Sequence, residues 1–479
     1  MSSLDDFELT VGLEVHAQLL TRSKIFTADA VSFGDEPNRH TSLITLAHPG
    51  TLPNLNKEVI SLAVRMGLAC GCKMADTVTF DRKNYFYPDL PKGYQITQDK
   101  NPICLGGMVR LPNGAQVALN RIHLEEDAGK SVHDADPEMT CLDFNRAGTP
   151  LIEIVTEPCI HSSEDAGLFM AEIRQTLKYL KVCDGNMEEG SLRADANVSV
   201  RKKGEKQLGR KVEIKNMNSI RNLKVAIEFE FKRQIELLNA GKTITSETRL
   251  FDAERGETFS MREKEELNDY RYFPEPDLSV FVLDPAFVES VALEMPKTGA
   301  QYAAILMETY GLSEYDARVI SSDERTVHYF LKVSDYCSDA KAISNWIMGP
   351  IRNMLNQEGQ QGELPAAEKM ATLIELIKAS KISYTIAAQK LFPMMVVQLD
   401  RSPLDLASEN GFLLQQDEGE LEQVIRDILR IYPLKIEEFK KGKKGILAMF
   451  MGEVMKRTKG KVDPKRANEL LIQEINKLN

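Results

Sequence analysis

Acidic and imidazole side chains stand at every second position near the start of the chain. Residues 12–18 alternate apolar and polar side chains, so a strand here places Glu14, His16 and Gln18 on one face. Carboxylate and imidazole groups on one sheet face can hold a metal ion. Mg²⁺ in particular binds through one or two carboxylates together with water and substrate phosphates. This stretch therefore predicts a metal-binding surface suited to nucleotide chemistry.

The same alternation recurs further along the chain, with carboxylates at the polar positions. It is found at residues 122–125, 151–155 and 194–200, which carry Glu125, Glu153 and Asp195. Each carboxylate taken singly is more typical of an exposed strand position than of a site. Four strands that repeat the pattern nevertheless favour one sheet with a shared acidic face.

Two turn-rich stretches, residues 81–95 and 269–277, combine aromatic side chains with charged ones. Loops of this kind commonly line sites, since aromatic rings offer stacking surfaces and cations offer charge to phosphates. The alternative interpretation is that the rings simply anchor each loop to the core.

Several widespread catalytic signatures are absent from the sequence. It contains no GxxxxGK[ST] loop, no GxGxxG between strand and helix, no GxSxG elbow, no HExxH pair and no CxxC…CxxC cluster. The absences argue against phosphate-loop and Rossmann enzymes, common hydrolases and zinc modules.

The elements that would position the site residues separate into three regions. At roughly 100–200 residues per domain, 479 residues suggest about three domains. Short alternating strands and two helices, one starting near Ser162 and one ending at Gly241, predict an α+β domain over residues 1–294. Helical spacing dominates residues 295–400 and again residues 401–479. The expected fold is α+β, followed by an all-helical connector and a helical tail domain.

The composition, with 43% hydrophobic and 27% charged residues, is that of an ordinary globular protein. The N-terminus is acidic, and no run of about 20 apolar residues occurs, so neither secretion nor membrane insertion is expected. Seven cysteines include one close pair, Cys70 and Cys72, whose spacing is too short for the usual zinc knuckle. We expect reduced thiols and a cytoplasmic location.

Charge is unevenly distributed along the chain, whose formal net charge is −11. Residues 433–466 contain eleven Lys or Arg and four Asp or Glu, a local net charge of +7. A basic patch on an acidic protein favours contact with a phosphate backbone. A solvated helix face explains the charge equally well.

Seven long stretches of the sequence are distinctive, and they spread through most of residues 11–278. They are VGLEVH, FDRKNYFYPDLPKGYQI, HLEEDAGKS, GTPLIEIVTEP, MEEGSLRADANVSV, EIKNMNS and DYRYFPEPDL. In these motifs the chain resembles the B subunit of the bacterial and organellar aspartyl/glutamyl-tRNA amidotransferase. Its C-terminal FKKGKKGILAMFMGEVMKRTKGKVDPKRANELL is also similar to the tail domain of that family, so the resemblance covers essentially the whole chain.

The resemblance implies a catalytic domain similar to that of glutamine synthetase, built on an antiparallel sheet. It also implies a reaction in which ATP phosphorylates the side-chain carboxylate of Glu-tRNA(Gln) or Asp-tRNA(Asn), and ammonia then displaces phosphate. The implied cofactors are ATP and Mg²⁺. The implied partners are an amidase-type A subunit that supplies ammonia, a small C subunit, and the misacylated tRNA.

The resemblance also assigns site residues by motif. The metal candidates are Glu14, His16, Glu125 or Glu126, Glu153 and Asp195. Alternation favours Glu125 over Glu126, because Glu125 shares a face with His123 and Arg121. Further candidates are Lys83, for the channel end or a phosphate contact, and Arg193 and Lys215, for nucleotide phosphates.

Two more expectations follow from the family pattern. Many members carry zinc-binding cysteine pairs after the first strand, whereas residues 26–30 and 43–50 have no cysteine here, so we expect no zinc. The helical tail is implied to approach the tRNA body. The expected phosphate contacts are Lys440, Lys441, Lys443, Lys444, Lys456, Arg457, Lys459 and Lys461.

Two other functions fit parts of the sequence. A metal-dependent, ATP-using amide ligase acting on a small molecule would use the acidic sheet but give the basic tail no role. A non-catalytic tRNA-binding scaffold would use the tail but leave the acidic strand faces idle. The long motif matches weigh against both.

Overall fold

The structure is a computed structural model. It describes residues 4–133, 136, 138–263, 270–357, 362–414, 418–440, 442–443, 445–458, 462 and 464–478. The chain forms two compact units, Met1–Thr298 and Gly299–Asn479. None of the helices in the described ranges is long and apolar enough to cross a membrane. The predicted division into three domains stays a prediction.

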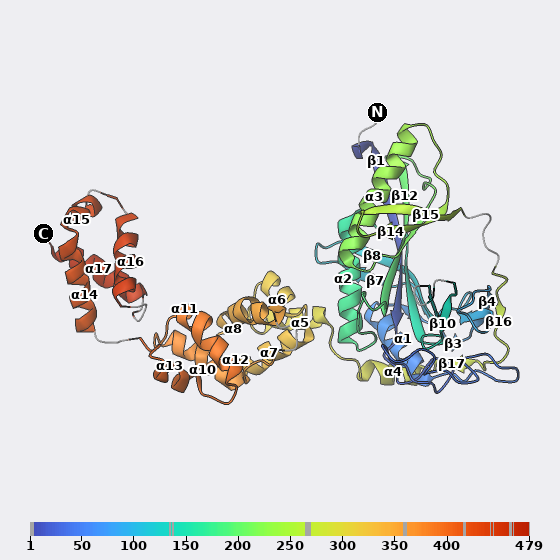
Figure 1. Cartoon of the computed structure of the whole chain (residues 1–479), viewed down its shortest axis with the longest axis horizontal. Coiled ribbons are helices and arrows are strands. Elements are labelled where there is room, and N and C mark those ends of the chain that lie inside the picture. Colours follow the sequence, from blue (N-terminus) through green and yellow to red (C-terminus); the bar gives the residue numbers. More distant parts are fainter. Residues whose placement is uncertain are drawn as a thin grey trace. The chain divides into compact units, whose positions relative to one another are not determined.

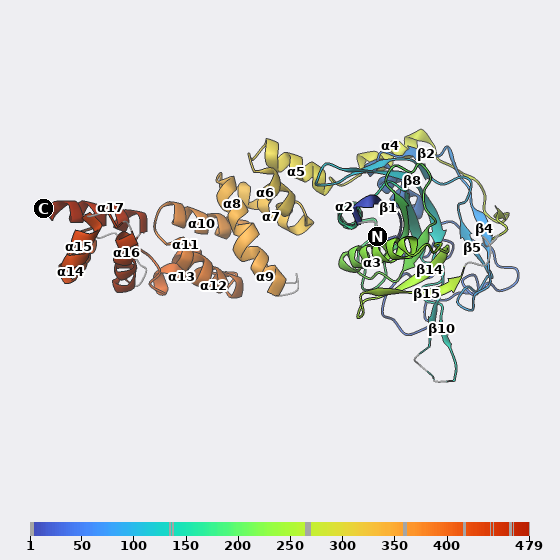
Figure 2. The same cartoon turned by 90° about the horizontal axis from the view of Figure 1, so that it is seen from above.

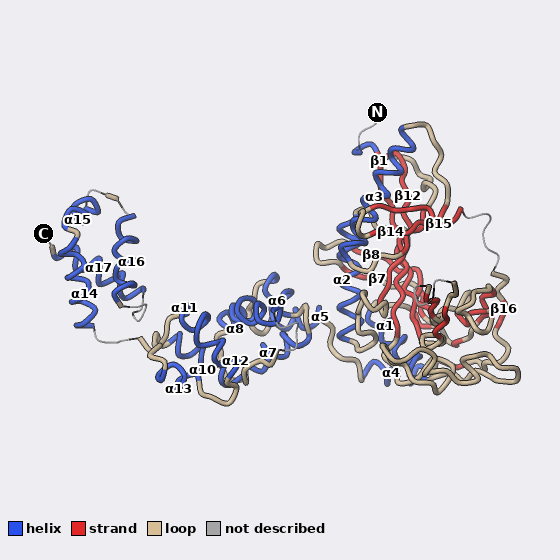
Figure 3. The backbone as a smooth tube through the Cα atoms, in the orientation of Figure 1, coloured by secondary structure: helices blue, strands red, loops and turns tan. Residues whose placement is uncertain are grey.

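A large sheet, mainly antiparallel, forms the centre of the first unit (Figures 1 and 3). Its strands are β1 (Phe7–Gln18), β2 (Lys73–Met74), β6 (Cys104–Leu105), β7 (Met108–Arg110), β8 (Gln116–Glu126), β11 (Pro150–Thr156), β12 (Leu192–Lys202), β13 (Val212–Lys215), β14 (Glu247–Asp252) and β15 (Glu257–Glu263). The strand order is β15-β14-β13-β12-β1-β11-β8-β6-β2, with β7 also paired to β8. The four carboxylate-bearing stretches of the sequence lie on β12, β1, β11 and β8, which are neighbours in this order. The predicted shared sheet is confirmed.

Short strands outside this sheet form three smaller ones. They are β9 (Lys130–Val132) with β10 (Cys141–Asp143), β16 (Phe273–Pro274) with β4 (Asp81–Asn84) and β5 (Tyr94–Thr97), and β17 (Phe281–Val282) with β3 (Thr77–Val78). The β4–β16 pair joins the two aromatic, charged stretches, which are about 190 residues apart, in antiparallel register.

The helices of the first unit are η1 (Leu4–Asp6), α1 (Lys57–Ala69), α2 (Ser163–Tyr179), α3 (Ile220–Asn239) and α4 (Pro285–Leu293). Ser162 caps α2, because its side-chain oxygen accepts a hydrogen bond from the Asp165 amide at 3.0 Å. Helix α3 ends just before Gly241, whose φ of 70° suits glycine. Both long helices that the sequence predicts are confirmed.

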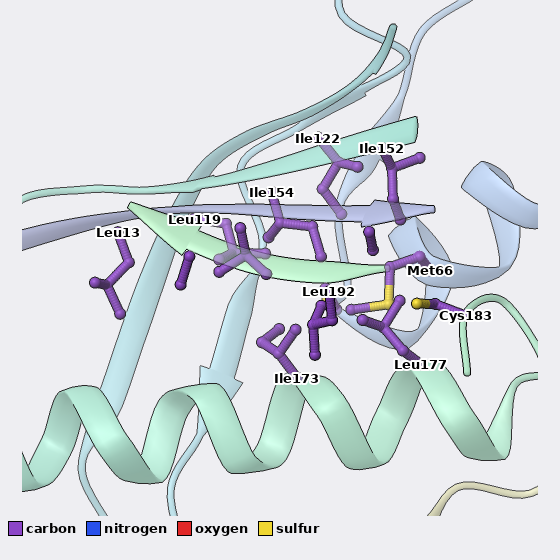
Figure 4. Packing of buried hydrophobic residues seen from close by; sticks show 14 of the residues in the cluster. Leu13, Met66, Leu119, Ile122, Ile152, Ile154, Ile173, Leu177, Cys183 and Leu192 are labelled. Carbon is purple, nitrogen blue, oxygen red and sulfur yellow. The ribbon is translucent and has the colours of Figure 1, made fainter. Parts of the chain in front are cut away.

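Helices cover one face of the sheet and leave the other face to the site (Figure 2). On β1, the apolar positions Leu13, Val15 and Ala17 are fully buried. Figure 4 shows Ile173 and Leu177 of α2 directed at the strands on this side. Burying each large apolar side chain stabilises the fold by about 1.5–3 kcal/mol. Because strand side chains alternate, this burial fixes the polar residues of β1 on the opposite face.

The regular elements in the described residues of the second unit are all helices. Its helices are α5 (Gly299–Glu308), α6 (Glu314–Ile320), α7 (Glu324–Ser334), α8 (Ala340–Trp346), η2 (Ile347–Ile351), α9 (Arg352–Gln357), α10 (Ala367–Lys378), α11 (Tyr384–Ile386), η3 (Ala387–Leu391), α12 (Phe392–Val397), α13 (Pro403–Glu409), α14 (Glu418–Ile431), α15 (Pro433–Lys440), α16 (Gly445–Arg457) and α17 (Pro464–Lys477). The last four share a core that includes Ile425, Phe450 and Leu471. The predicted α+β fold with a helical C-terminal part is confirmed.

Candidate active site

The polar face of β1 forms the floor of the candidate site. Thr10, Gly12, Glu14, His16 and Gln18 follow one another on this face, as the period of a strand requires. The side chains opposite them on β11 and β12 extend the face sideways. Two acidic clusters lie on this face, and a cavity opens at each of its ends.

The first cluster joins His16 with Glu125 and Glu153. One ligand atom from each lies within 4.8 Å of the other two. His16 Nε2 lies 3.6 Å from Glu125 Oε1 and 3.5 Å from Glu153 Oε2. Burial alone would lower the pKa of His16, but Glu153 and Glu125 raise it to about 9. The cluster offers one imidazole and two carboxylates to a cation.

Strand pairing explains why these residues meet. Glu153 on β11 stands opposite His16 on β1 and opposite His123 on β8. Directly opposed residues on one sheet face are close enough to interact. Although burial opposes the shift, His123 and His16 hold the pKa of Glu153 well below its ordinary value.

The second cluster consists of Glu14, Asp195 and Glu213, again with one oxygen from each within 4.8 Å of the others. Glu14 on β1 stands opposite Asp195 on β12, two residues from the His16 position. Asn197 Nδ2 donates to Glu14 Oε1 at 2.9 Å. Burial and the charge of Glu153 raise the pKa of Glu14. Three carboxylates at this spacing repel one another unless a cation lies between them.

Lys215 supplies such a cation in this structure. Its Nζ lies 2.7 Å from Asp195 Oδ2 and 3.1 Å from Glu213 Oε1. Burial by itself lowers the pKa of Lys215, but the two carboxylates raise it above its ordinary value. The predicted phosphate ligand therefore lies within the second cluster.

Arg193 stands opposite His16 on β12 and is anchored by Asp127. Its NH2 donates to Asp127 Oδ2 at 3.0 Å, and Gln18 Nε2 donates to the same oxygen at 3.0 Å. Burial by itself would raise the pKa of Asp127, but Arg193 and Arg146 lower it. The Nε of Arg193 is buried and has no hydrogen-bond partner among the described residues. The side chain is thus held beside the first cluster with donor capacity left over.

Glu126 is turned away from both clusters. Lys92 Nζ donates to its Oε2 at 2.6 Å, and the Ile96 amide donates to its Oε1 at 2.8 Å. Its side chain is 2% exposed. Of the two neighbouring glutamates in the predicted set, the structure brings only Glu125 to the first cluster.

Lys83 lies among tyrosines of the two aromatic stretches. Its Nζ is 4.8 Å from the ring centroid of Tyr270 and 5.8 Å from that of Tyr85. Those two rings lie 6.0 Å apart. Burial and the charges of Glu125 and Glu126 raise the pKa of Tyr85. Position 269 of the second aromatic stretch lies outside the described residues.

Two cavities open at the ends of the polar face. One has a volume of about 350 Å³, and the residues that line it include Thr10, Gly12, Glu14, Thr156, Pro158, Asn197, Ser199, Leu208, Gly209 and Lys211. The other, of about 600 Å³, is lined by Gln18, Arg146 and Ser191 together with the loop over residues 31–37. The face therefore runs from a cavity, past two acidic clusters, to a second cavity.

Two protein families match this chain. The family described as "GatB/GatE catalytic domain" matches residues 9–289, and the family described as "GatB domain" matches residues 328–475. The chain belongs to the GatB family.

Relatives resemble this GatB-family chain over nearly its whole length. The B subunit of the aspartyl/glutamyl-tRNA(Asn/Gln) amidotransferase of Alkalilimnicola ehrlichii is 43% identical over 98% of this chain and 99% of its own. The proteins of the same name from Caldicellulosiruptor bescii and Anaeromyxobacter dehalogenans are 42% and 45% identical, over 99% and 98% of this chain and 100% and 99% of their own.

Three residues of this candidate site escaped the sequence-based assignment. Glu213 completes the second cluster, His123 contacts the first, and Asp127 anchors Arg193. Glu213 and Lys215 alternate within the EIK segment of β13, so the pattern that identified the other strands also marks Glu213. Asp127 keeps the two-residue period of His123 and Glu125, but it lies just beyond the end of β8.

Proposed function

We propose that this chain is the subunit of a tRNA-dependent amidotransferase that converts Glu-tRNA(Gln), Asp-tRNA(Asn) or both to the corresponding amides. The names of its relatives support this assignment. The observation that carries it is the order of groups along one sheet face: a cavity, two acidic clusters with an arginine beside them, and a second cavity. This order suits a nucleotide and the side-chain carboxylate of an esterified amino acid, the phosphoryl acceptor, that meet above the clusters.

The chemistry of the reaction requires that the γ-phosphate of ATP and the side-chain carboxylate meet at one place. A carboxylate resists attack by ammonia, because its leaving group would be oxide. We propose that a side-chain oxygen of the esterified amino acid attacks the γ-phosphorus of ATP and that ADP leaves. Ammonia then attacks the acyl carbon, inorganic phosphate leaves with the C–O bond electrons, and one proton is released.

The donor sets of the two clusters fit divalent cations. Glu14, Asp195 and Glu213 offer only carboxylate oxygens, the ligands that Mg²⁺ prefers. The set of His16, Glu125 and Glu153 adds an imidazole nitrogen and also suits Mn²⁺ or a similar ion. Bound there, such ions would neutralise charge that gathers between the two anionic substrates.

The chain's own cations complete this charge balance. Arg193 lies beside the first cluster, where its guanidinium, partly exposed and held by Asp127, can bind oxygens of the phosphoryl group in transfer. Lys215 holds Asp195 and Glu213 close together, and it can turn to a nucleotide phosphate once those carboxylates bind a metal ion. Lys83 and the tyrosines around it are the proposed end of the ammonia path.

The cavity of about 350 Å³ is the proposed position of the nucleotide base and ribose. The hydroxyl of Thr10 lies buried at this cavity without a hydrogen-bond partner among the described residues. An unmet buried hydroxyl costs free energy until a ligand pairs with it. Asn197 and Ser199 add polar atoms to the same wall.

A substitution at Gly12 tests this position. A Cβ at residue 12 would lie 3.8 Å from Pro158 Cα and 3.9 Å from Thr156 Oγ1, which are ordinary contacts. Gly12→Ala should therefore leave the KM for ATP nearly unchanged. Gly12→Leu fills the cavity and should raise this KM about tenfold or more, equivalent to about 1.4 kcal/mol of lost binding. Steady-state kinetics at varied ATP concentration measures the KM of both variants. An unchanged KM in Gly12→Leu would show that the nucleotide base does not bind in this cavity.

The tail is the proposed contact for the body of the tRNA. Of the expected residues, Lys440, Lys443, Lys456 and Arg457 are described, whereas positions 441, 444, 459 and 461 lie outside the described residues. Lys443 pairs with Glu438 at 3.1 Å, and Lys440 donates to the carbonyl oxygen of Leu478.

Removing these charges should weaken tRNA binding in steps. Each contact that is lost, as in Lys456→Ala or Arg457→Ala, should lower the slope of log K against log salt by about 1. Lys456→Arg keeps the charge and serves as control. Binding assays at several salt concentrations measure the slope. A slope that stays constant through all substitutions would show that the tail does not contact the tRNA.

The proposed activity itself is tested by release of phosphate from the γ-position of ATP. The full chain, co-purified with its amidase-type A subunit and small C subunit, is assayed with and without Glu-tRNA(Gln). Release that depends on the charged tRNA supports the proposal. Release without tRNA would indicate a small-molecule ligase, and no release under either condition would indicate a scaffold.

A further inference from the structure

We propose that His123 is a positioning residue for the first cluster: it donates its Nε2–H to Glu153 and so fixes the carboxylate that the cluster presents to a metal ion. The inference rests on the proposed function, because that function places a cation at His16, Glu125 and Glu153. His123 becomes the fourth residue of the cluster, and its role is to orient the metal ligand Glu153.

The geometry points from His123 to Glu153 in particular. The Nε2 of His123 lies 3.2 Å from Glu153 Oε2 and 3.8 Å from Glu125 Oε2. His123 is 3% exposed, and it stands directly opposite Glu153 in the β8–β11 register. A side chain fixed by both strand pairing and burial has little freedom to leave this contact.

Cation binding makes this contact more important. In the structure, His16 Nε2 also approaches Glu153 Oε2, at 3.5 Å. A cation bound by His16 takes the lone pair of that nitrogen, so His16 then offers Glu153 no proton from Nε2. His123 remains as the group that can hold the outer side of the Glu153 carboxylate. Hydrogen bonds of this kind set the orientation and basicity of a metal ligand.

The other ring nitrogen of His123 supports the assignment. Nδ1 is buried and has no hydrogen-bond partner among the described residues. A buried N–H group that has no acceptor costs more free energy than a buried nitrogen lone pair that has no donor. The tautomer with its proton on Nε2 is therefore favoured, and this tautomer can donate to Glu153.

Two amide substitutions separate positioning from mere packing. The amide nitrogen of His123→Gln can reach the position of Nε2 and donate to Glu153. The amide of His123→Asn reaches only the position of Nδ1 and cannot. Both residues are polar and smaller than histidine, so a packing role predicts similar losses in the two variants.

The experiment measures Mn²⁺ binding to the full chain by the electron paramagnetic resonance signal of the free ion. We expect two classes of site, one for each cluster. His123→Asn should weaken one class about 10- to 100-fold, whereas His123→Gln should stay within a few-fold of the wild type. Glu153→Gln should abolish the same class. Circular dichroism confirms that each variant is folded.

The outcomes distinguish the inference from the function on which it rests. Wild-type Mn²⁺ binding in His123→Asn, together with a loss in Glu153→Gln, would overturn the role of His123 and leave the metal site intact. Wild-type binding in Glu153→Gln would overturn the first-cluster metal site itself.

A measurement on the unmodified chain covers the case in which the variants do not fold. The long-range ¹⁵N–¹H spectrum of the imidazole rings reports the tautomer of each of the seven histidines. A proton on Nε2 of His123 is expected. A neutral ring with its proton on Nδ1 would overturn the inference, because such a ring has nothing to donate to Glu153.

Discussion

Replacing Glu125 by glutamine should lower the rate of tRNA-dependent phosphate release by about 10²–10³-fold while the protein stays folded. The substitution keeps the shape of the side chain but removes one of the two negative charges of the first cluster, and a neutral amide binds Mg²⁺ poorly. Single-turnover release of phosphate from labelled ATP by the assembled enzyme measures the effect.

Glu126→Gln is the matched control, because the neighbouring glutamate faces the other way. The carboxylate of Glu126 accepts hydrogen bonds from Lys92 and from the backbone N–H of Ile96. Replacing it with the glutamine side chain should therefore lower the free energy of unfolding by about 1–3 kcal/mol. Its kcat should stay within a few-fold of the wild type. Equal loss of kcat in both folded variants would show that the two glutamates share one role, contrary to the assignment.

Arg193→Lys should lower kcat by about 10²-fold or more, with a much smaller effect on the KM for ATP. Lysine keeps the positive charge, but it carries all its donors on one nitrogen, so it cannot span from Asp127 to a phosphoryl oxygen as the separate nitrogens of the guanidinium can. The effect falls mainly on kcat because negative charge accumulates on the transferring group in the transition state.

Arg201→Lys on the same strand serves as its control. Arg201 Nε pairs with Glu8 Oε2 at 2.8 Å, eight residues along β12 from Arg193. We expect it to change neither kinetic constant by more than about twofold, since exposed or partly exposed ion pairs contribute about 0–1 kcal/mol. Similar losses of kcat in the two variants would point to a general requirement for arginine on this strand.

The strands that carry the site could be predicted from local sequence because their signal has a period of two. The alternation around Glu14, Glu153 and Asp195 correctly placed these residues on one face, and it favoured Glu125 over its neighbour, in agreement with the hydrogen bonds of Glu126. The helices begin and end where Ser162 and Gly241 indicate.

What escaped prediction depends on pairing between distant segments. Alternation cannot tell which strands become neighbours, so it could not separate the predicted metal residues into two clusters or bring Glu213 to Glu14. Asp127 lies just beyond the end of β8, so no local pattern shows that it meets Arg193 of β12. The approach of Lys83 to Tyr270, across nearly 190 residues, follows from the β4–β16 pairing, which no local pattern specifies.

The placement of consecutive subsites at every second residue of β1 makes the length of this strand as important as its composition. A single residue inserted between Gly12 and His16 would send one half of the strand's polar side chains into the helix-covered core and bring Leu13 or Val15 to the surface in their place. Insertions of equal size in the surface loops would disturb neither cluster. Loop lengths are therefore expected to vary more freely among related proteins, whereas an insertion of one residue within β1 is expected to destroy the site even where every site residue is retained.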